Sequence, residues 1–213
     1  RSSDLSTSID TVLPVLGTRP PCLGREPDLA ILEATLAHCR IESQSQAILI
    51  TAAAGIGKTR LRQEFVLRTR RRSQPPTVLV GLGQFLSAGA PYSLLSSGLR
   101  RLCGIEALGS PSLEMQRLRQ SCTELLGASE GEKIAPFLAR LCGIWLADSD
   151  IPELRAANND PRIMSLHIRE ALTAFLRAWC ERNPLVWIFD DLHWGDALSV
   201  ELLASLLRAL DTC

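Results

Sequence analysis

The sequence predicts an α/β fold with a parallel β-sheet, and two observations lead to this prediction. Short apolar runs without apolar–polar alternation, at 46–51, 77–82 and 185–189, are typical of strands that are covered on both faces. The segments between and after these runs have Leu and Ile spaced three and four residues apart, which indicates helices. Strands that alternate with helices favour a parallel sheet.

The other elements follow in chain order around these strands. Residues 1–20 are rich in Ser, Thr and Asp and are expected to form a linker, which leaves 21–213 as the folded domain. Pro27 predicts the start of a first helix, because proline suits a first helical turn. Further helices are expected over about 57–70, 92–104, 112–127, 130–145, 161–182 and 197–210, with a loop over 146–160. The stretch 92–182 would therefore form a helical insertion within the domain.

The charge balance and the cysteines narrow the class of protein. The 213 residues include 23 basic and 23 acidic ones, and this balance argues against a mainly electrostatic partner such as duplex DNA or an anionic membrane. No apolar run approaches the roughly 18 residues that span a bilayer, and residues 1–10 lack the apolar core of a signal peptide. The 7 cysteines are scattered, without the spacing of a zinc or redox pair, and indicate reduced thiols in a cytoplasmic protein.

The segment 48–61 joins a predicted strand, a loop of small residues and a predicted helix, which is the context of a phosphate-binding loop (P-loop). Backbone N–H groups in such a loop wrap a phosphate, and the following helix presents its positive N-terminal end. Lys58 would contact the β- and γ-phosphates, and the Thr59 hydroxyl would complete the coordination of Mg²⁺. The candidate nucleotide-binding residues of the loop are Ala52, Ala53, Ala54, Gly55, Ile56, Gly57, Lys58 and Thr59.

Two details of this loop bear on its chemistry. The strict pattern has glycine at position 52, and we treat Ala52 as a tolerated variant. Lys58 is one of only 2 lysines among the 23 basic residues, the other being Lys133. A compact ammonium fits a phosphate loop where a broad guanidinium would not, so lysine at this position supports the interpretation.

A second group of candidate residues follows the apolar run 185–189. Asp190 and Asp191 stand at the predicted carboxyl end of a strand, where open parallel sheets bind ligands. We assign Asp190 to Mg²⁺, opposite the threonine of the P-loop. Asp191 is then placed to orient or deprotonate the attacking water and is the candidate catalytic residue. The alternative is a plain strand end leading into a turn, which the upstream P-loop disfavours.

Longer motifs carry a resemblance to one family. The segment Asp190–Asp196, with the sequence DDLHWGD, resembles the Walker B segment of AAA-like ATPase modules of the STAND type, which occur in large bacterial signalling proteins. Residues 23–29 are similar to a segment that lies near the adenine in that family, so the resemblance makes Arg25 a candidate for the nucleotide site. Residues 87–92 and 154–162 are similar to the ATPase region that follows a serine/threonine protein kinase domain in some bacterial regulators.

The resemblance covers about residues 22–211 and implies the P-loop NTPase fold, a three-layer α/β/α arrangement around a parallel sheet, with ATP and Mg²⁺ as ligands. In that fold, a strand after the Walker B strand inserts between it and the P-loop strand. Because the chain ends at Cys213 after one more helix, we expect the N-terminal part of the domain, truncated, with an incomplete sheet. A gap in the sheet would leave unpaired backbone groups. Many P-loop ATPases have glutamate where this chain has Asp191, and the shorter acid predicts slow hydrolysis.

Two functions are compatible with these motifs. The first is ATP binding with slow hydrolysis, as a regulatory switch in a multidomain bacterial signalling protein such as a serine/threonine protein kinase. The neighbouring domains of that protein would then be its partners. The alternative is a nucleotide-gated protein-interaction module without significant turnover. A third function, an ATPase that handles nucleic acid, is disfavoured by the neutral charge balance.

Overall fold

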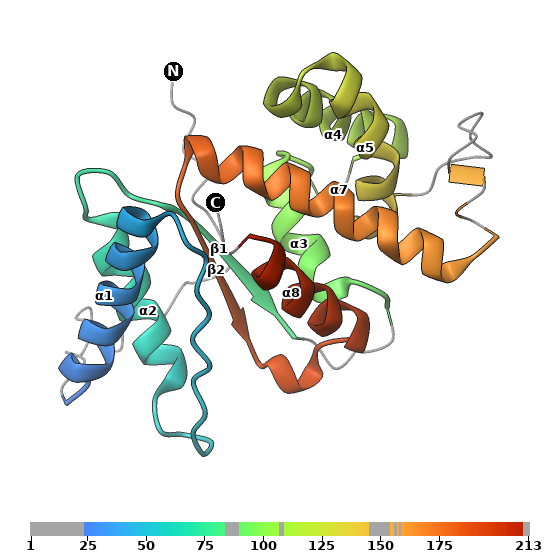
Figure 1. Cartoon of the computed structure of the whole chain (residues 1–213). Helices are drawn as coiled ribbons and strands as arrows, with labels where there is room; N and C mark the ends of the chain where they lie inside the picture. The colour runs from blue at the N-terminus through green and yellow to red at the C-terminus, as the bar shows by residue number, and fades with distance from the viewer. Residues whose placement is uncertain are drawn as a thin grey trace.

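The computed structural model of the chain describes residues 24–83, 90–106, 109–144, 154–155, 157 and 159–210. The predicted linker, residues 87–89 and most of the predicted loop over 146–160 lie outside these residues. The elements in chain order are α1 (Glu26–Glu42), α2 (Lys58–Arg70), β1 (Thr77–Leu82), α3 (Ser93–Leu102), α4 (Pro111–Leu126), α5 (Ala128–Leu141), α7 (Pro161–Arg182), β2 (Leu185–Asp190), the short 3₁₀ helix η3 (Leu192–Trp194) and α8 (Ala197–Ala209) (Figure 1). Each helix that the sequence predicts is present.

Local capping explains where the longer helices begin. Asp160 accepts a hydrogen bond from the backbone N–H of Arg162 at 2.8 Å, and proline follows it in the first turn of α7. Ser110 caps α4 in the same way, through a bond of 3.3 Å from the N–H of Leu113. Both side chains satisfy helix N–H groups that have no partner within the helix.

The two described strands form a parallel pair. Thr77 is paired with Leu185, and the register continues to Leu82 and Asp190. This confirms the parallel sheet that the alternation of strands and helices predicts. Because parallel strands run in the same direction, the carboxyl ends of β1 and β2 meet at one edge, and Asp190 lies at that edge.

The strand predicted over 46–51 is wrong for this structure. Residues 44–53 have no regular secondary structure, and the apolar side chains of Ile48, Leu49 and Ile50 are 42%, 75% and 45% exposed. A strand satisfies its N–H and C=O groups through neighbouring strands. In the described part of the chain, the sheet consists of β1 and β2 only, so this segment has no strand to pair with. This small sheet of the described residues is consistent with the incomplete sheet expected from the sequence.

Helices cover both faces of the strand pair, in the three layers that the sequence predicts (Figure 1). Val186 and Ile188 of β2 pack against a small cluster from α1 and α2: Leu29, Leu36, Leu61 and Phe65. The alternate side chains Leu185, Trp187 and Phe189 pack against the larger core on the other face, to which α3, α7 and α8 contribute. Alternation of side chains along a strand is what lets one strand serve two cores.

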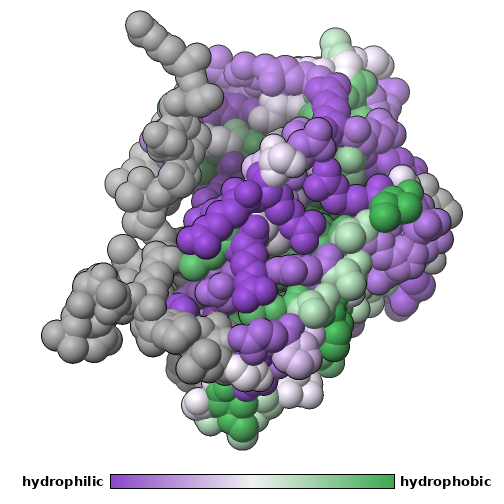
Figure 2. All heavy atoms as spheres, turned by 90° about the vertical axis from the view of Figure 1, so that its left-hand side faces the viewer, coloured by the Kyte–Doolittle hydropathy of each residue, from purple (hydrophilic) through white to green (hydrophobic). Residues whose placement is uncertain are grey.

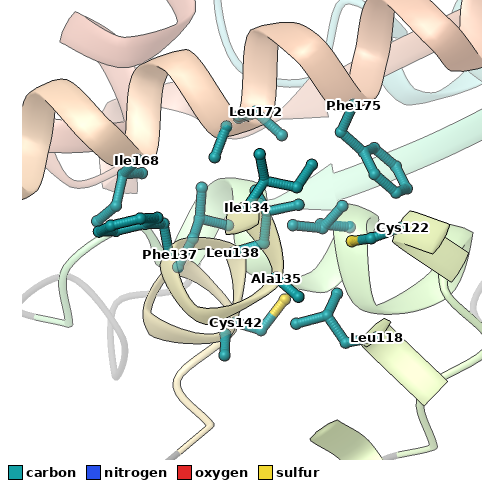
Figure 3. Close-up of a cluster of buried hydrophobic side chains, with 14 of the residues drawn as sticks. Leu118, Cys122, Ile134, Ala135, Phe137, Leu138, Cys142, Ile168, Leu172 and Phe175 are labelled. Carbon is teal, nitrogen blue, oxygen red and sulfur yellow. The ribbon is translucent and has the colours of Figure 1, made fainter. Parts of the chain in front are cut away.

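The helical insertion carries most of the larger core. Figure 3 shows α4, α5 and α7 meeting through buried side chains, among them Leu118, Leu138 and Phe175, each with 0% exposure. Helices α4 and α5 approach each other closely at Gly131. A Cβ on this glycine would lie only 2.6 Å from the backbone of Thr123. No helix in the described part of the chain combines the length and the apolar character that crossing a bilayer requires.

The described cysteines form no disulfide in this structure; they are Cys39, Cys103, Cys122, Cys142 and Cys180. Cys103, Cys122 and Cys142 are buried in the larger core, where a thiol behaves as a small apolar side chain.

Candidate nucleotide-binding site

The predicted P-loop has the backbone conformation that its glycines allow. Gly55 and Gly57 have φ values of +81° and +92°, in the left-handed region that residues with a Cβ rarely adopt. Gly57 is the N-cap of α2, and no side chain caps this helix end. The N–H groups of the first turn are therefore open to an anionic ligand, which the helix dipole also favours.

Lys58 is folded back onto the loop that precedes it. Its Nζ donates hydrogen bonds to the carbonyl oxygens of Ala52 at 2.7 Å and Ala53 at 3.0 Å. The loop thus wraps around its own ammonium group. To contact a phosphate, Lys58 must exchange these two carbonyl bonds for bonds to phosphate oxygens.

Arg25 joins the segment before α1 to the P-loop. Its Nη2 donates to the carbonyl oxygen of Ile56 at 2.6 Å, and its Nη1 pairs with Asp28 at 2.9 Å. The structure thus brings together two segments that the sequence assigns separately to the nucleotide site. Figure 2 shows the face formed by α1 and α2 as mainly hydrophilic, with apolar side chains at its lower end and along its right-hand side. Ile56 is 52% exposed.

Asp190 ends β2 with both carboxylate oxygens engaged. Its Oδ2 lies 3.2 Å from Nε of Arg62, which stands on α2 one helical turn after Lys58. Its Oδ1 accepts the backbone N–H of Asp191 at 3.1 Å. The ion pair is sheltered, since the two side chains are only 11% (Arg62) and 18% (Asp190) exposed. The first turns of α2 and the carboxyl end of β2 therefore lie side by side.

Asp191 is held in an unusual backbone conformation. It has φ 51° and ψ 44°, and its side chain is exposed. The carbonyl oxygen of Asp191 accepts the N–H of Trp194 at 2.9 Å, which closes the turn that leads into η3. A Cβ on Gly83, directly after β1, would clash with that same carbonyl. The approach of this turn to the end of β1 therefore requires glycine at position 83.

Asp196, at the end of the DDLHWGD segment, has a structural role. Its buried carboxylate caps α8 through the N–H of Ser199 at 2.8 Å and the hydroxyl of Ser199 at 2.6 Å. The same carboxylate accepts the N–H of Tyr92 at 2.9 Å and the hydroxyl of Ser93 at 3.1 Å, at the start of α3. Burial alone would raise the pKa of Asp196, but the hydrogen bonds from Ser199, Tyr92 and Leu94 outweigh it and hold the pKa below its ordinary value.

The arrangement fits a nucleotide with a divalent cation. The loop provides an uncapped helix N-terminus and a lysine for phosphate oxygens. Thr59 is exposed in the first turn of α2, and its hydroxyl and the Asp190 carboxylate are the hard oxygen donors that Mg²⁺ prefers. The described residues, those of the site included, contain no cluster of three His, Cys, Asp or Glu side chains that could hold a metal ion.

Three residues at or near the site have roles that the motifs did not predict. Arg62 lies four positions after Lys58, and helical spacing alone places both on one face of α2. Asp196 precedes a helix with serine three positions later, which is the pattern of an N-cap. Gly83 directly follows a strand, but no local pattern signals that another turn packs against it.

Comparison with known proteins identifies the class. The family model of the AAA ATPase domain matches residues 21–212, and the chain therefore belongs to this family, as its P-loop and Walker B-like segment predict. AAA ATPase domains generally use ATP and Mg²⁺. An uncharacterized protein of Rhizobium meliloti (strain 1021) is 24% identical over 205 residues, which is 89% of this chain and 17% of the relative. No solved structure gives a significant match.

Proposed function

We propose that this AAA ATPase domain binds ATP with Mg²⁺ at residues 52–59, hydrolyses it slowly and acts as a regulatory switch. The observation that carries the proposal is the juxtaposition of the uncapped N-terminus of α2 with the carboxyl end of β2, joined by the Arg62–Asp190 pair. A phosphate-binding helix start and a carboxylate for Mg²⁺ must be adjacent for this chemistry.

The side chains take separate roles in this proposal. Lys58 neutralises charge on the β- and γ-phosphates, and Thr59 and Asp190 hold Mg²⁺. Bound Mg²⁺ neutralises charge that develops on the phosphate oxygens. Asp191 orients the attacking water, and its exposed position leaves room for one. Arg25 fixes the segment before α1 against the loop, on the side where the resemblance puts the adenine.

The switch role rests on what nucleotide binding must change. Lys58 has to leave the carbonyls of Ala52 and Ala53, and the loop around it must rearrange. Order changes of this kind around a γ-phosphate are a common switching device. We propose that neighbouring domains of a larger STAND-type signalling protein, such as a serine/threonine protein kinase, receive this change. The resemblance of 154–162 supports that context, and so does the length of the relative, of which this chain spans 17%.

The second candidate function is a nucleotide-gated interaction module without significant turnover. It is favoured by the short side chain of Asp191 and by the left-handed backbone conformation that this residue must hold. A misplaced or short acid slows hydrolysis but leaves phosphate binding intact.

Measuring ATP turnover in the full-length protein separates the two functions. We expect slow turnover in the wild type, and a fall of about tenfold or more in Asp191→Asn with unchanged ATP affinity, because general acid–base groups contribute on the order of 10²–10⁴-fold. Glu201→Gln, at an exposed position on α8, serves as the control and should leave turnover unchanged. ATP binding without turnover in the wild type would support the second function. Equal turnover in Asp191→Asn and the wild type would exclude the assigned acid.

A further inference from the structure

Arg62 occupies the carboxylate that the proposed function assigns to Mg²⁺. Its Nε is 3.2 Å from Oδ2 of Asp190, and both side chains are largely shielded from water. The other oxygen of Asp190 accepts the N–H of Asp191. Each carboxylate oxygen thus has a contact within the chain, and the contact with Nε of Arg62 is an ion pair and not a hydrogen bond.

Two other arginines of α2 form ion pairs with glutamates. Arg60 pairs with Glu64 at 3.7 Å, and Arg68 pairs with Glu64 at 3.2 Å and with Glu33 of α1 at 3.6 Å. These pairs stabilise the α1–α2 layer and involve no predicted site residue. Among the ion pairs described for α2, only that of Arg62 reaches the end of the sheet.

A guanidinium in this place opposes a cation at the same carboxylate. Arginine keeps its charge at any physiological pH, so it cannot yield the carboxylate by losing a proton. Two cations near one oxygen repel each other, and the repulsion is stronger in a sheltered site than in water. Mg²⁺ can engage Asp190 fully only when the Arg62 side chain moves away or gives up part of its contact.

We propose that Arg62 is a positioning residue that holds Asp190 in the arrangement seen here and is displaced when Mg²⁺ and nucleotide bind. This inference rests on the proposed function, because it takes Asp190 as the Mg²⁺ ligand. Lys58, one turn before Arg62 on α2, donates to the carbonyl oxygens of Ala52 and Ala53, so both cationic side chains have partners within the chain. Binding of Mg²⁺ and nucleotide would break the contacts of Lys58 with the loop carbonyls and of Arg62 with Asp190. The conformation of the first two turns of α2 would therefore depend on whether Mg²⁺ and nucleotide are bound.

The test is the dependence of ATP affinity on Mg²⁺, measured by calorimetry on the full chain with Mg²⁺ and with EDTA. In Arg62→Gln, the ratio of the Kd in EDTA to the Kd in Mg²⁺ should rise about fivefold, as expected for the loss of roughly one charge-pair interaction. Arg68→Gln removes an arginine of the same helix that has no contact with Asp190, and its ratio should equal that of the wild type.

A double-mutant cycle keeps the inference falsifiable if Arg62→Gln loses stability. In the Asp190→Asn background, adding Arg62→Gln should leave the ratio of the two Kd values unchanged. As a single substitution, Arg62→Lys keeps the charge, and its ratio should stay within about twofold of that of the wild type. An unchanged ratio in a folded Arg62→Gln protein that still binds ATP would overturn the role of Arg62. If the wild type binds no ATP with or without Mg²⁺, the proposed function itself fails, which is a distinguishable result.

Discussion

At the scale of single residues, the segment Asp190–Asp196 contains carboxylates that the fold uses in different ways. Asp190 is paired with Arg62, Asp191 is exposed in a left-handed turn, and Asp196 is buried as a cap. The sequence shows three acids in one short motif. Only the structure shows that the last of them ties the start of α3 to the start of α8.

Replacing Asp196 with asparagine should destabilise the protein by about 2 kcal/mol at pH 7. The physical reason is that both carboxylate oxygens accept hydrogen bonds, so an amide NH₂ would face donors on one side. Urea unfolding measures the loss. Asp160→Asn is the matched control, because Asp160 caps α7 through the bond from the N–H of Arg162 and asparagine is a good N-cap.

The Asp196 contribution should also depend on pH. Its pKa is lowered in the folded protein, so the stabilisation is present above the ordinary carboxyl pKa of 3.8 and is lost as the pH falls through the lower folded value. The stability difference between the wild type and Asp196→Asn should therefore shrink when unfolding is measured at progressively lower pH below 4. A difference that grows on acidification would contradict the assignment.

Gly83→Ala should displace the turn at Asp191 and cost about 1–3 kcal/mol of stability. The added methyl group would clash with the backbone carbonyl of Asp191, which belongs to a rigid turn. Gly109→Ala is the control, because its Cβ would meet the side chain of Glu114 at 3.2 Å and the backbone carbonyl of Glu106 only at an ordinary van der Waals distance of 3.7 Å. Denaturation midpoints compare the two variants. Equal midpoints would show that the turn yields without cost.

At the scale of elements, the sequence predicted the helices and two of the strands correctly, and one strand that it predicted did not form. The helices have apolar spacing and local capping residues such as Asp160, and these signals lie within the element itself. The run 46–51 has the composition of a buried strand, but a strand also needs neighbours, and those are not encoded in the run. In the described part of the chain, that neighbour is missing, and the segment stays irregular.

Hydrogen exchange should separate this segment from the sheet. The amides of 47–51 should exchange much faster than those of β1 and β2, because the ladder of hydrogen bonds between the two strands protects them. Peptide-resolved mass spectrometry of the full chain measures both. Protection of 47–51 equal to that of β1 would indicate a strand pairing that differs from this structure.

The thiols of the helical insertion should resist modification. Burial raises the pKa of Cys103 to about 12, and the pKa values of Cys122 and Cys142 are raised as well. Since the thiolate is the reactive form, iodoacetamide should label these three far more slowly than the half-buried Cys39 and Cys180 in the native protein. In denaturant, all five should react alike. Fast native labelling of Cys122 would mean that the α4–α5 core opens readily.

At the scale of the whole molecule, the motifs predicted the class of protein, and the roles of the candidate site residues stay predictions. The parallel strand pair with helices on both faces agrees with the sequence, and Asp190 lies beside α2. The tertiary contacts of the site were not predictable, because Arg62 and Gly83 act on residues more than a hundred positions away. Such pairings are set by the packing of α2 and β1 against the end of β2.

The central claim is that Lys58 and its loop bind the phosphates of ATP, and calorimetric titration of the full chain with ATP and Mg²⁺ tests it most directly. The wild type and Lys133→Ala, which changes the other lysine at an exposed position, should bind alike. Lys58→Ala should lose about tenfold or more in affinity, because charge-assisted hydrogen bonds of about 1.5–3 kcal/mol are removed. Equal affinity of Lys58→Ala and the wild type would contradict the account.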